Sequence, residues 1–214
     1  MVRIFFIFSS LFIFLKMEAQ TKVSSPVGEY YLRGVPETAS GFNLANDSTF
    51  QFFFSQGALD RFGQGTWSIK NNQVVLNSKE KPGLDFALTA SSQKDGKDIH
   101  ISVKDQNENI LRYVYCIVKG GGKTQEAMAK EDGTFQFEPQ TIDSIELIFE
   151  FCPEKISIFP VTNKDHNFFE FKFEPWLFEI FFKDFKLSQA AGALTGPSPV
   201  LQGENFTYKR SGNE

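Results

Sequence analysis

A long succession of short apolar runs, each closed by turn-forming residues, constrains this chain more than any other feature. Residues 49–54 read TFQFFF and residues 168–174 read FFEFKFE, so bulky aromatic side chains recur at every second position. Because successive side chains of a β-strand point to opposite faces, such alternation indicates sheets with one buried and one solvated face. No long helical pattern interrupts the runs, and the sequence therefore predicts an all-β fold.

The runs fall into two groups, which predict two small antiparallel β domains. The first group covers residues 29–33, 41–45, 49–54, 66–77 and 84–90. The second group covers residues 99–104, 110–119, 134–138, 144–151, 155–161, 168–174, 177–187 and 205–209. Asn71-Asn72 is a turn signal that makes 66–77 a hairpin. We therefore expect an N-terminal β-meander domain over residues 20–96 and a C-terminal β-sandwich domain over residues 97–214.

Ahead of these domains, residues 1–19 have the layout of a secretory signal peptide. The basic residue Arg3 precedes the apolar run IFFIFSSLFIFL, and the small residue Ala19 follows it. A helix over this run would be roughly 18 Å long, which is short of a hydrocarbon core of about 30 Å. The sequence therefore predicts cleavage after Ala19, a mature chain that starts at Gln20 without a membrane span, and an exported protein that is periplasmic, cell-surface or extracellular.

The charge composition argues against one class of partner. The 22 Lys and Arg residues are outnumbered by 26 Asp and Glu residues, and no run of basic residues is present. A surface that follows the phosphates of a nucleic acid needs clustered basic side chains, so no nucleic-acid partner is expected.

The segment from residue 99 to residue 151 carries a spaced series of turn and strand residues. The series consists of Asp105, Asn107, Leu111, Asp132, Gly133, Phe135 and Phe137. Over about residues 97–161 it resembles the carboxypeptidase regulatory-like domain, a prealbumin-like β-sandwich, although Ser102 stands where that family commonly has Gly. The resemblance implies a non-catalytic accessory sandwich of exported proteins. The N-terminal part is similar in style to secreted lipocalin-like β-meanders.

One short pattern occurs twice in the chain. Asp47-Ser48-Thr49-Phe50 is matched by Asp132-Gly133-Thr134-Phe135. Asp followed by Ser or Gly favours a turn, and Thr-Phe favours a strand, so we interpret the repeat as convergence on one local solution and not as a duplicated domain.

Motifs of catalysis, metal binding and cofactor binding are missing from the sequence. Its two histidines, His100 and His166, stand in polar surroundings and lack the spacing of metal ligands. No nucleophile elbow, phosphate-binding loop or dinucleotide fingerprint occurs. We therefore expect no metal, no cofactor and no enzymatic activity. Carboxylates that meet only in three dimensions leave a hydrolase open as an alternative.

The segment GALDRFGQGTW at residues 57–67 is the densest special stretch. Its candidate ligand-binding residues are Asp60, Arg61, Phe62 and Trp67. As a ligand loop, it would offer two aromatic platforms beside a charged pair. As a structural hairpin, its Asp would cap the turn and its Trp would fill the core, and we favour this interpretation.

A second candidate is the Phe-rich stretch at residues 168–185, which includes Trp176. It holds more aromatic residues than one face of one strand can bury, which leaves room for an apolar pocket or a partner surface. The two cysteines are expected to be free thiols, because strand parity places Cys116 on a buried face and Cys152 on the opposite, polar one.

Taken together, these features predict an exported, non-catalytic binding or structural accessory protein of the cell envelope. Its partner would be an unidentified envelope or extracellular protein or a small ligand. The alternatives are a lipocalin-like carrier of a small apolar ligand, which needs a barrel with an open apolar interior, and the hydrolase named above.

Overall fold

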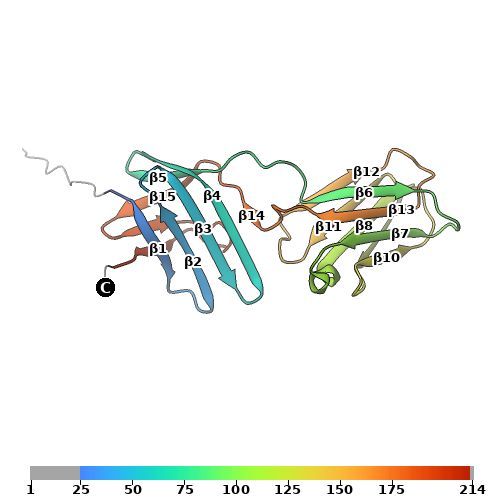
Figure 1. Cartoon of the computed structure of the whole chain (residues 1–214), viewed down its shortest axis with the longest axis horizontal. Coiled ribbons are helices and arrows are strands. Elements are labelled where there is room, and N and C mark those ends of the chain that lie inside the picture. The colour runs from blue at the N-terminus through green and yellow to red at the C-terminus, as the bar shows by residue number, and fades with distance from the viewer. Residues whose placement is uncertain (1–24, 213–214) are drawn as a thin grey trace, which may run out of the picture.

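The computed structural model describes residues 25–212, which form two all-β lobes side by side along one axis (Figure 1). One lobe is a closed barrel and the other is a sandwich of two sheets. Two chain segments, residues 78–85 and residues 174–184, connect the lobes. The predicted all-β fold is confirmed. The predicted signal peptide and its cleavage point lie outside the described residues.

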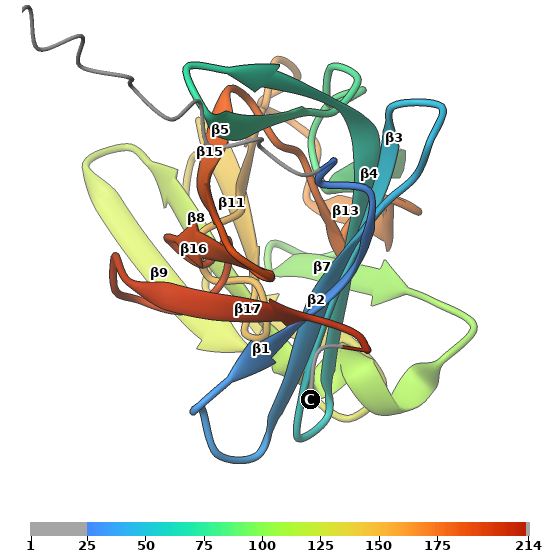
Figure 2. The same ribbon diagram turned by 90° about the vertical axis from the view of Figure 1, so that its left-hand side faces the viewer.

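The barrel is built from both ends of the described chain. Its strands are β1 (Gly28–Arg33), β2 (Thr38–Leu44), β3 (Thr49–Gln56), β4 (Leu59–Lys70), β5 (Gln73–Asn77), β15 (Phe185–Ala190), β16 (Ala193–Gly196) and β17 (Phe206–Arg210). Hydrogen bonds run in the order β4-β3-β2-β1-β17-β16-β15-β5, and β5 also pairs with β4, so the sheet closes on itself, as the end-on view of Figure 2 shows. The short strand β14 (Glu179–Ile180) pairs in parallel with Phe62 and Gly63 of β4, on the edge of β4 that β5 occupies further along the strand.

Local sequence signals explain how the barrel wall turns and bends. Asn71 and Asn72 both have positive φ, at 50° and 61°, which is the backbone of a tight hairpin turn, and the predicted hairpin is confirmed. Inside the wall, a Cβ on Gly63 would lie 2.5 Å from the Phe182 ring, and one on Gly65 would lie 2.1 Å from the Asn77 carbonyl oxygen. Glycine is therefore required where β4 passes close to its neighbours.

The sandwich is inserted between β5 and β14. Its strands are β6 (Phe86–Ser92), β7 (Ile99–Lys104), β8 (Val114–Gly120), β9 (Lys123–Met128), β10 (Thr134–Phe137), β11 (Ser144–Phe149), β12 (Ile156–Pro160) and β13 (Phe168–Phe173), with the 3-10 helix η1 (Glu108–Tyr113) before β8. One sheet has the order β10-β7-β13-β6 and the other β12-β11-β8-β9. Val103, Leu147 and Phe171 are fully buried between them, so each sheet turns its apolar face inward.

The observed pairing differs from the predicted division between residues 96 and 97. Strand β6 precedes that division but pairs with β13 in the sandwich, and β15 and β17 follow it but pair with β5 and β1 in the barrel. Apolar alternation marks where strands occur, but the partner of a strand is set by contacts far away in the chain. The prediction therefore grouped neighbouring strands, which is the commoner arrangement but not the one adopted here.

The Phe-rich stretch at residues 168–185 supplies two separate cores. Phe171 and Phe178 belong to or contact the sandwich core, whereas Phe182 is buried in the barrel core and Phe185 packs beside it. The rings of Phe182 and Phe50 lie with centroids 5.1 Å apart in an edge-to-face arrangement. The surplus of aromatic residues in this stretch thus reflects a chain that crosses from one lobe to the other.

The twice-occurring Asp turn has the same geometry in both lobes. Asp47 Oδ1 accepts the backbone N–H of Thr49 at 3.0 Å and its hydroxyl at 2.6 Å, and Asp132 accepts the same two groups of Thr134 at the same distances. The pKa of each carboxyl lies below its ordinary value, chiefly because of the hydroxyl bond. The shared local geometry in two different sheets supports convergence.

Both cysteines are free and buried in the sandwich core, and the expectation of two free thiols is confirmed. Cys152 is buried because its N–H closes a turn onto the Phe149 carbonyl at 2.8 Å, which rotates it away from the polar face that strand parity assigns to it. Burial raises the pKa of both thiols, that of Cys152 to about 11.

Candidate functional site

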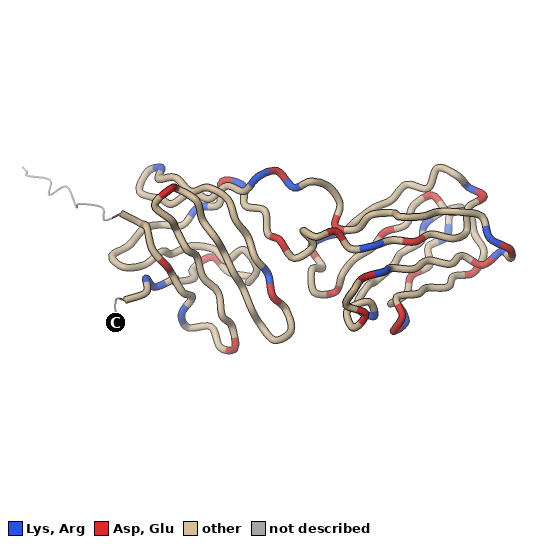
Figure 3. The backbone as a smooth tube through the Cα atoms, in the orientation of Figure 1, with Lys and Arg blue, Asp and Glu red and all other residues tan. Residues whose placement is uncertain are grey.

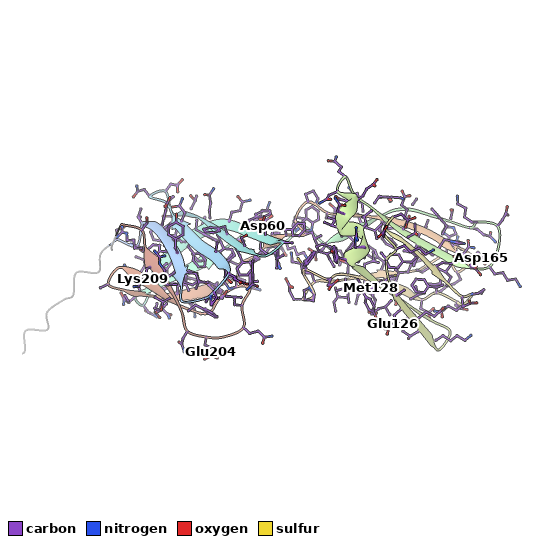
Figure 4. All side chains as sticks on the ribbon, turned by 90° about the horizontal axis from the view of Figure 1, so that it is seen from below. Asp60, Glu126, Met128, Asp165, Glu204 and Lys209 are labelled. Carbon is purple, nitrogen blue, oxygen red and sulfur yellow. The ribbon has the colours of Figure 1, made fainter. Side chains whose placement is uncertain are left out.

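The predicted ligand segment is a turn followed by the first half of β4, and its side chains point to opposite sides of the barrel wall. Asp60 and Phe62 are exposed on the outside, whereas Arg61 is only 5% exposed and Trp67 packs against the barrel core. Asp60 lies at the end of the barrel that faces the sandwich (Figure 4). The structure therefore does not bring the predicted residues together into one site.

Arg61 is a structural residue at the junction of the lobes. Its Nη2 donates to Glu154 Oε1 of the sandwich at 2.8 Å, and its Nε donates to the Phe178 carbonyl oxygen at 3.2 Å. Since its guanidinium is enclosed and both Nε and Nη2 are bonded within the protein, Arg61 has little to offer a ligand. It connects a barrel strand, a sandwich loop and the segment between them.

Lys155 ties the same connecting segment to the sandwich. Its Nζ donates to the carbonyl oxygens of Leu177 and Glu179 at 2.7 and 2.8 Å, and it lies 3.4 Å from Asp85 Oδ1. Burial lowers the pKa of Lys155, and the Asp85 carboxylate opposes this effect. This cluster was missed by sequence reasoning, because its members are far apart in the chain.

Both tryptophans donate a hydrogen bond from the indole N–H group to a backbone carbonyl oxygen. Trp67 Nε1 donates to the Ala45 carbonyl at 3.0 Å, and Trp176 Nε1 donates to the Leu84 carbonyl at 2.9 Å. Both side chains are half-buried. These contacts favour structural roles for the two tryptophans over roles as ligand platforms.

Three aromatic side chains lie next to one another on the outer face of the barrel. We call Tyr31, Phe53 and Phe62 the aromatic strip; they are 36%, 41% and 43% exposed. Phe53 faces Phe62 across β3 and β4, and on its other side it faces Gly41 of β2, which in turn faces Tyr31 of β1. The strip therefore crosses four adjacent strands at one level of the barrel.

Gly41 is the residue that lets the strip form. A Cβ at this position would lie 2.8 Å from Cε1 of Phe53 and 2.5 Å from the Tyr30 carbonyl oxygen. Without that Cβ, the Phe53 ring lies over β2 and reaches Tyr31, with ring centroids 6.1 Å apart and planes at 62°. The strip is thus a built feature of the sheet surface and not three unrelated exposed residues.

A row of polar side chains runs beside the aromatic strip, two residues further along the strands. Across the sheet, Glu29 faces Asn43, Asn43 faces Gln51, and Gln51 faces Gln64. The strip and this row line a depression of about 370 Å³. A second depression of about 680 Å³ shares Gln51 and Gln64 and continues to Thr66. We call the two together the outer groove.

The outer groove carries little charge. Strands β2 and β3 contain no ionisable side chain, and their courses in Figure 3 are free of blue and red. Glu29 and Lys79 supply the charges among the residues that line the groove. The Tyr31 hydroxyl donates to Glu29 Oε2 at 2.8 Å, and this bond is the main reason why the pKa of Tyr31 is raised.

The interior of the barrel is occupied by aromatic rings. Phe42 lies with its ring centroid 4.9 Å from those of Phe52 and Tyr208, and Phe182 lies 5.5 Å from Phe52. All four side chains are buried. The inside of the barrel is therefore a packed core, and the exposed aromatic surface of this lobe lies on its outside.

Of the sequence-predicted residues, Phe62 alone belongs to the outer groove. Phe53, Tyr31 and the amides were missed, although TFQFFFSQ held a usable signal. Its alternation puts Phe53 on the face opposite Phe50 and Phe52, so one large aromatic residue had to be exposed if the others formed the core. Tyr31 and Gln64 join it through strand pairing, which no local pattern indicates.

Comparisons with protein-family models, with curated proteins and with solved structures found no match. Within residues 25–212, no three His, Cys, Asp or Glu side chains come together in a way that could hold a metal ion. In the same part of the chain, no helix has the length and apolar character needed to cross a bilayer. The outer groove is the candidate site that the geometry supports best.

Proposed function

We propose that this chain is an exported, non-catalytic binding protein of the cell envelope or the extracellular space, and that its ligand binds in the outer groove. The observation that carries the proposal is the aromatic strip, three large rings left in contact with water beside a core that is rich in buried Phe. An exposed apolar patch with a polar rim is typical of a binding surface.

The sandwich fits the role of an accessory module in this proposal, as its resemblance to carboxypeptidase regulatory-like domains implies. The residues that carry the resemblance have structural roles: Asn107 accepts the Asn109 N–H at the start of η1, and Leu111 is the buried residue of that helix. Asp132 caps the turn before β10. None of these side chains is arranged for chemistry, which supports a scaffold that holds the barrel.

The carrier alternative receives less support. A ligand inside the barrel would have to displace the rings of Phe42, Phe52 and Tyr208, which are buried and in contact with one another. Removing such contacts from a close-packed core is unfavourable. The hydrolase alternative needs two facing carboxylates, and the outer groove presents Glu29, whose Oε2 already accepts the Tyr31 hydroxyl.

A thermal-shift screen tests the proposal. The protein from an exporting host is heated with a library of sugars, peptides and lipids, beside a Phe53→Ala/Phe62→Ala variant. We expect ligands that raise the melting temperature of the wild type but not of the variant, because binding to the folded state alone stabilises it. Stabilisation that survives in the variant would place the site elsewhere, and turnover of a stabilising compound would refute the non-catalytic role.

A further inference from the structure

We infer that the outer groove binds a neutral, polyhydroxylated chain, that is, a stretch of uncharged polysaccharide. This inference rests on the proposed function, because it names the ligand class of the same site. It is drawn from four features of the groove: its rings, its free amides, its length and its lack of charge.

The aromatic strip suits the apolar face of a sugar ring. A pyranose ring presents C–H bonds on one face, and these pack against the electron-rich face of an aromatic ring, while its hydroxyl groups point outward around the edge. Phe53 and Phe62 face each other across adjacent strands and are both exposed. They offer ring surface to one sugar unit or two successive units, and Tyr31 extends this surface across the sheet.

The polar row suits the hydroxyl groups of the same ligand. The side-chain amides of Asn43, Gln51 and Gln64 are exposed and make no hydrogen bond to another described residue. Each amide has an N–H₂ donor and a carbonyl acceptor, and each sugar hydroxyl is likewise both donor and acceptor. A line of such amides beside a line of rings therefore matches a molecule whose polar edge lies next to an apolar face.

The shape of the groove favours a chain over a single sugar. From Phe62 to Thr66 the groove follows β4 for about 13 Å at the usual rise of a strand. The two depressions of about 370 and 680 Å³ are neighbours that both border Gln51 and Gln64. A ligand that fills both must be extended along the strands, with its more apolar part on the aromatic strip.

Charge and sheet topology argue against two other classes of ligand. A phosphorylated or sulfated chain would find Lys79 as the one basic residue among those lining the groove, and it would also meet the carboxylate of Glu29. A peptide cannot add to this surface as a strand, because β3 is paired on both sides, by β2 and by β4. A proline-rich peptide, which binds aromatic surfaces without strand pairing, is the competitor that the experiment has to separate.

Affinity electrophoresis provides the test. The protein is run through native gels that contain xyloglucan, β-1,3-glucan or galactomannan as neutral probes, or polygalacturonate as an acidic probe. We expect retardation by at least one neutral polysaccharide and none by polygalacturonate. The retardation should be insensitive to added salt, because no ion pair contributes to binding.

Variants assign the retardation to the groove. Phe53→Ala and Phe62→Ala should each weaken the affinity by about tenfold, and Gln64→Ala by about threefold or more. The matched control is Ile69→Ala, which removes an equally exposed apolar residue, 47% exposed, from the same strand but outside the groove, and should leave affinity unchanged. Melting curves of all four variants verify that they are folded.

The outcomes distinguish the inference from the proposed function. Retardation that Phe62→Ala weakens and Ile69→Ala preserves supports both. No retardation by any neutral polysaccharide, together with groove-dependent binding of a proline-rich peptide in solution, overturns the glycan inference and leaves the groove as a binding site. Retardation that is equal in all variants overturns the inference and the assignment of the site together.

Discussion

Replacing Arg61 should destabilise the folded chain, whereas replacing its neighbour Asp60 should not. The two residues are adjacent on β4 and both charged, but Arg61 is 5% exposed and bonded to Glu154 and to the Phe178 carbonyl, while Asp60 is exposed. A comparison of the two variants therefore separates a junction residue from a surface residue at almost the same place in the chain.

The magnitude follows from what Arg61→Ala removes. The buried bond from a charged donor to the Phe178 carbonyl contributes about 1.5–3 kcal/mol. The two methylene groups that alanine lacks contribute about 0.8 kcal/mol each when fully buried. The bond to Glu154, whose side chain is 57% exposed, adds less than about 1 kcal/mol. We expect a loss of about 3–5.5 kcal/mol for Arg61→Ala, about 1.5–4 kcal/mol for Arg61→Met, which keeps the stem, and less than about 0.5 kcal/mol for Asp60→Ala.

Thermal unfolding of the three variants beside the wild type measures these differences. For a protein of this size, 1 kcal/mol corresponds to about 2–4 °C, so Arg61→Ala should melt about 6–22 °C lower. Equal melting temperatures for Arg61→Ala and Asp60→Ala would refute the junction role. An Arg61→Ala variant of normal stability with lost ligand binding would instead support the ligand loop, which was the less favoured interpretation of this segment.

Three further predictions concern other parts of the chain. Trp67→Phe should cost about 1 kcal/mol for the lost indole bond and Trp67→Ala about 3 kcal/mol, both in urea denaturation; equal costs would show that the N–H bond contributes nothing. Cys116 and Cys152 should resist a thiol reagent in the native protein, because burial raises their pKa values, and both should react in denatured, unreduced protein; a titre of zero would reveal a disulfide. The lowered pKa values of Asp47 and Asp132 stabilise the fold above the unfolded pKa of about 3.9, and this contribution is lost as the pH falls through the folded pKa values. The Asp47→Asn/Asp132→Asn double variant should therefore lose less stability than the wild type below about pH 4. Parallel profiles of stability against pH for the two proteins would contradict the turn assignment.

Local features of this fold were predictable because their causes are local. The alternation of TFQFFFSQ identifies β3, and Asn71-Asn72 identifies the turn before β5. Cys116 is buried as strand parity predicts, whereas Cys152 departs from parity because the strand ends before it and the chain turns. Prediction works where a few neighbouring residues decide the backbone.

Long-range features were not predictable, because they depend on residues that are far apart in the chain. The barrel closes because Tyr30 pairs opposite Arg210, and nothing in either strand marks the other as its partner. The outer groove likewise depends on register, which puts Phe62 opposite Phe53 and leaves room over Gly41. The sequence segment around Phe62 offered an exposed aromatic residue only in its less favoured interpretation as a ligand loop, and its adjacent charge, Arg61, belongs to the junction with the sandwich.

The most direct test of the binding claim is to map the bound ligand on the protein by amide chemical shifts, using an oligosaccharide cut from the polysaccharide that retards it most. We expect the perturbed amides to concentrate on the outer faces of β1 to β4, around Tyr31, Phe53, Phe62 and Gln64. Perturbations centred on Leu194 and Tyr208, which belong to the barrel core and do not line the groove, would show a ligand inside the barrel and would contradict the outer groove as the site. So would perturbations confined to the sandwich.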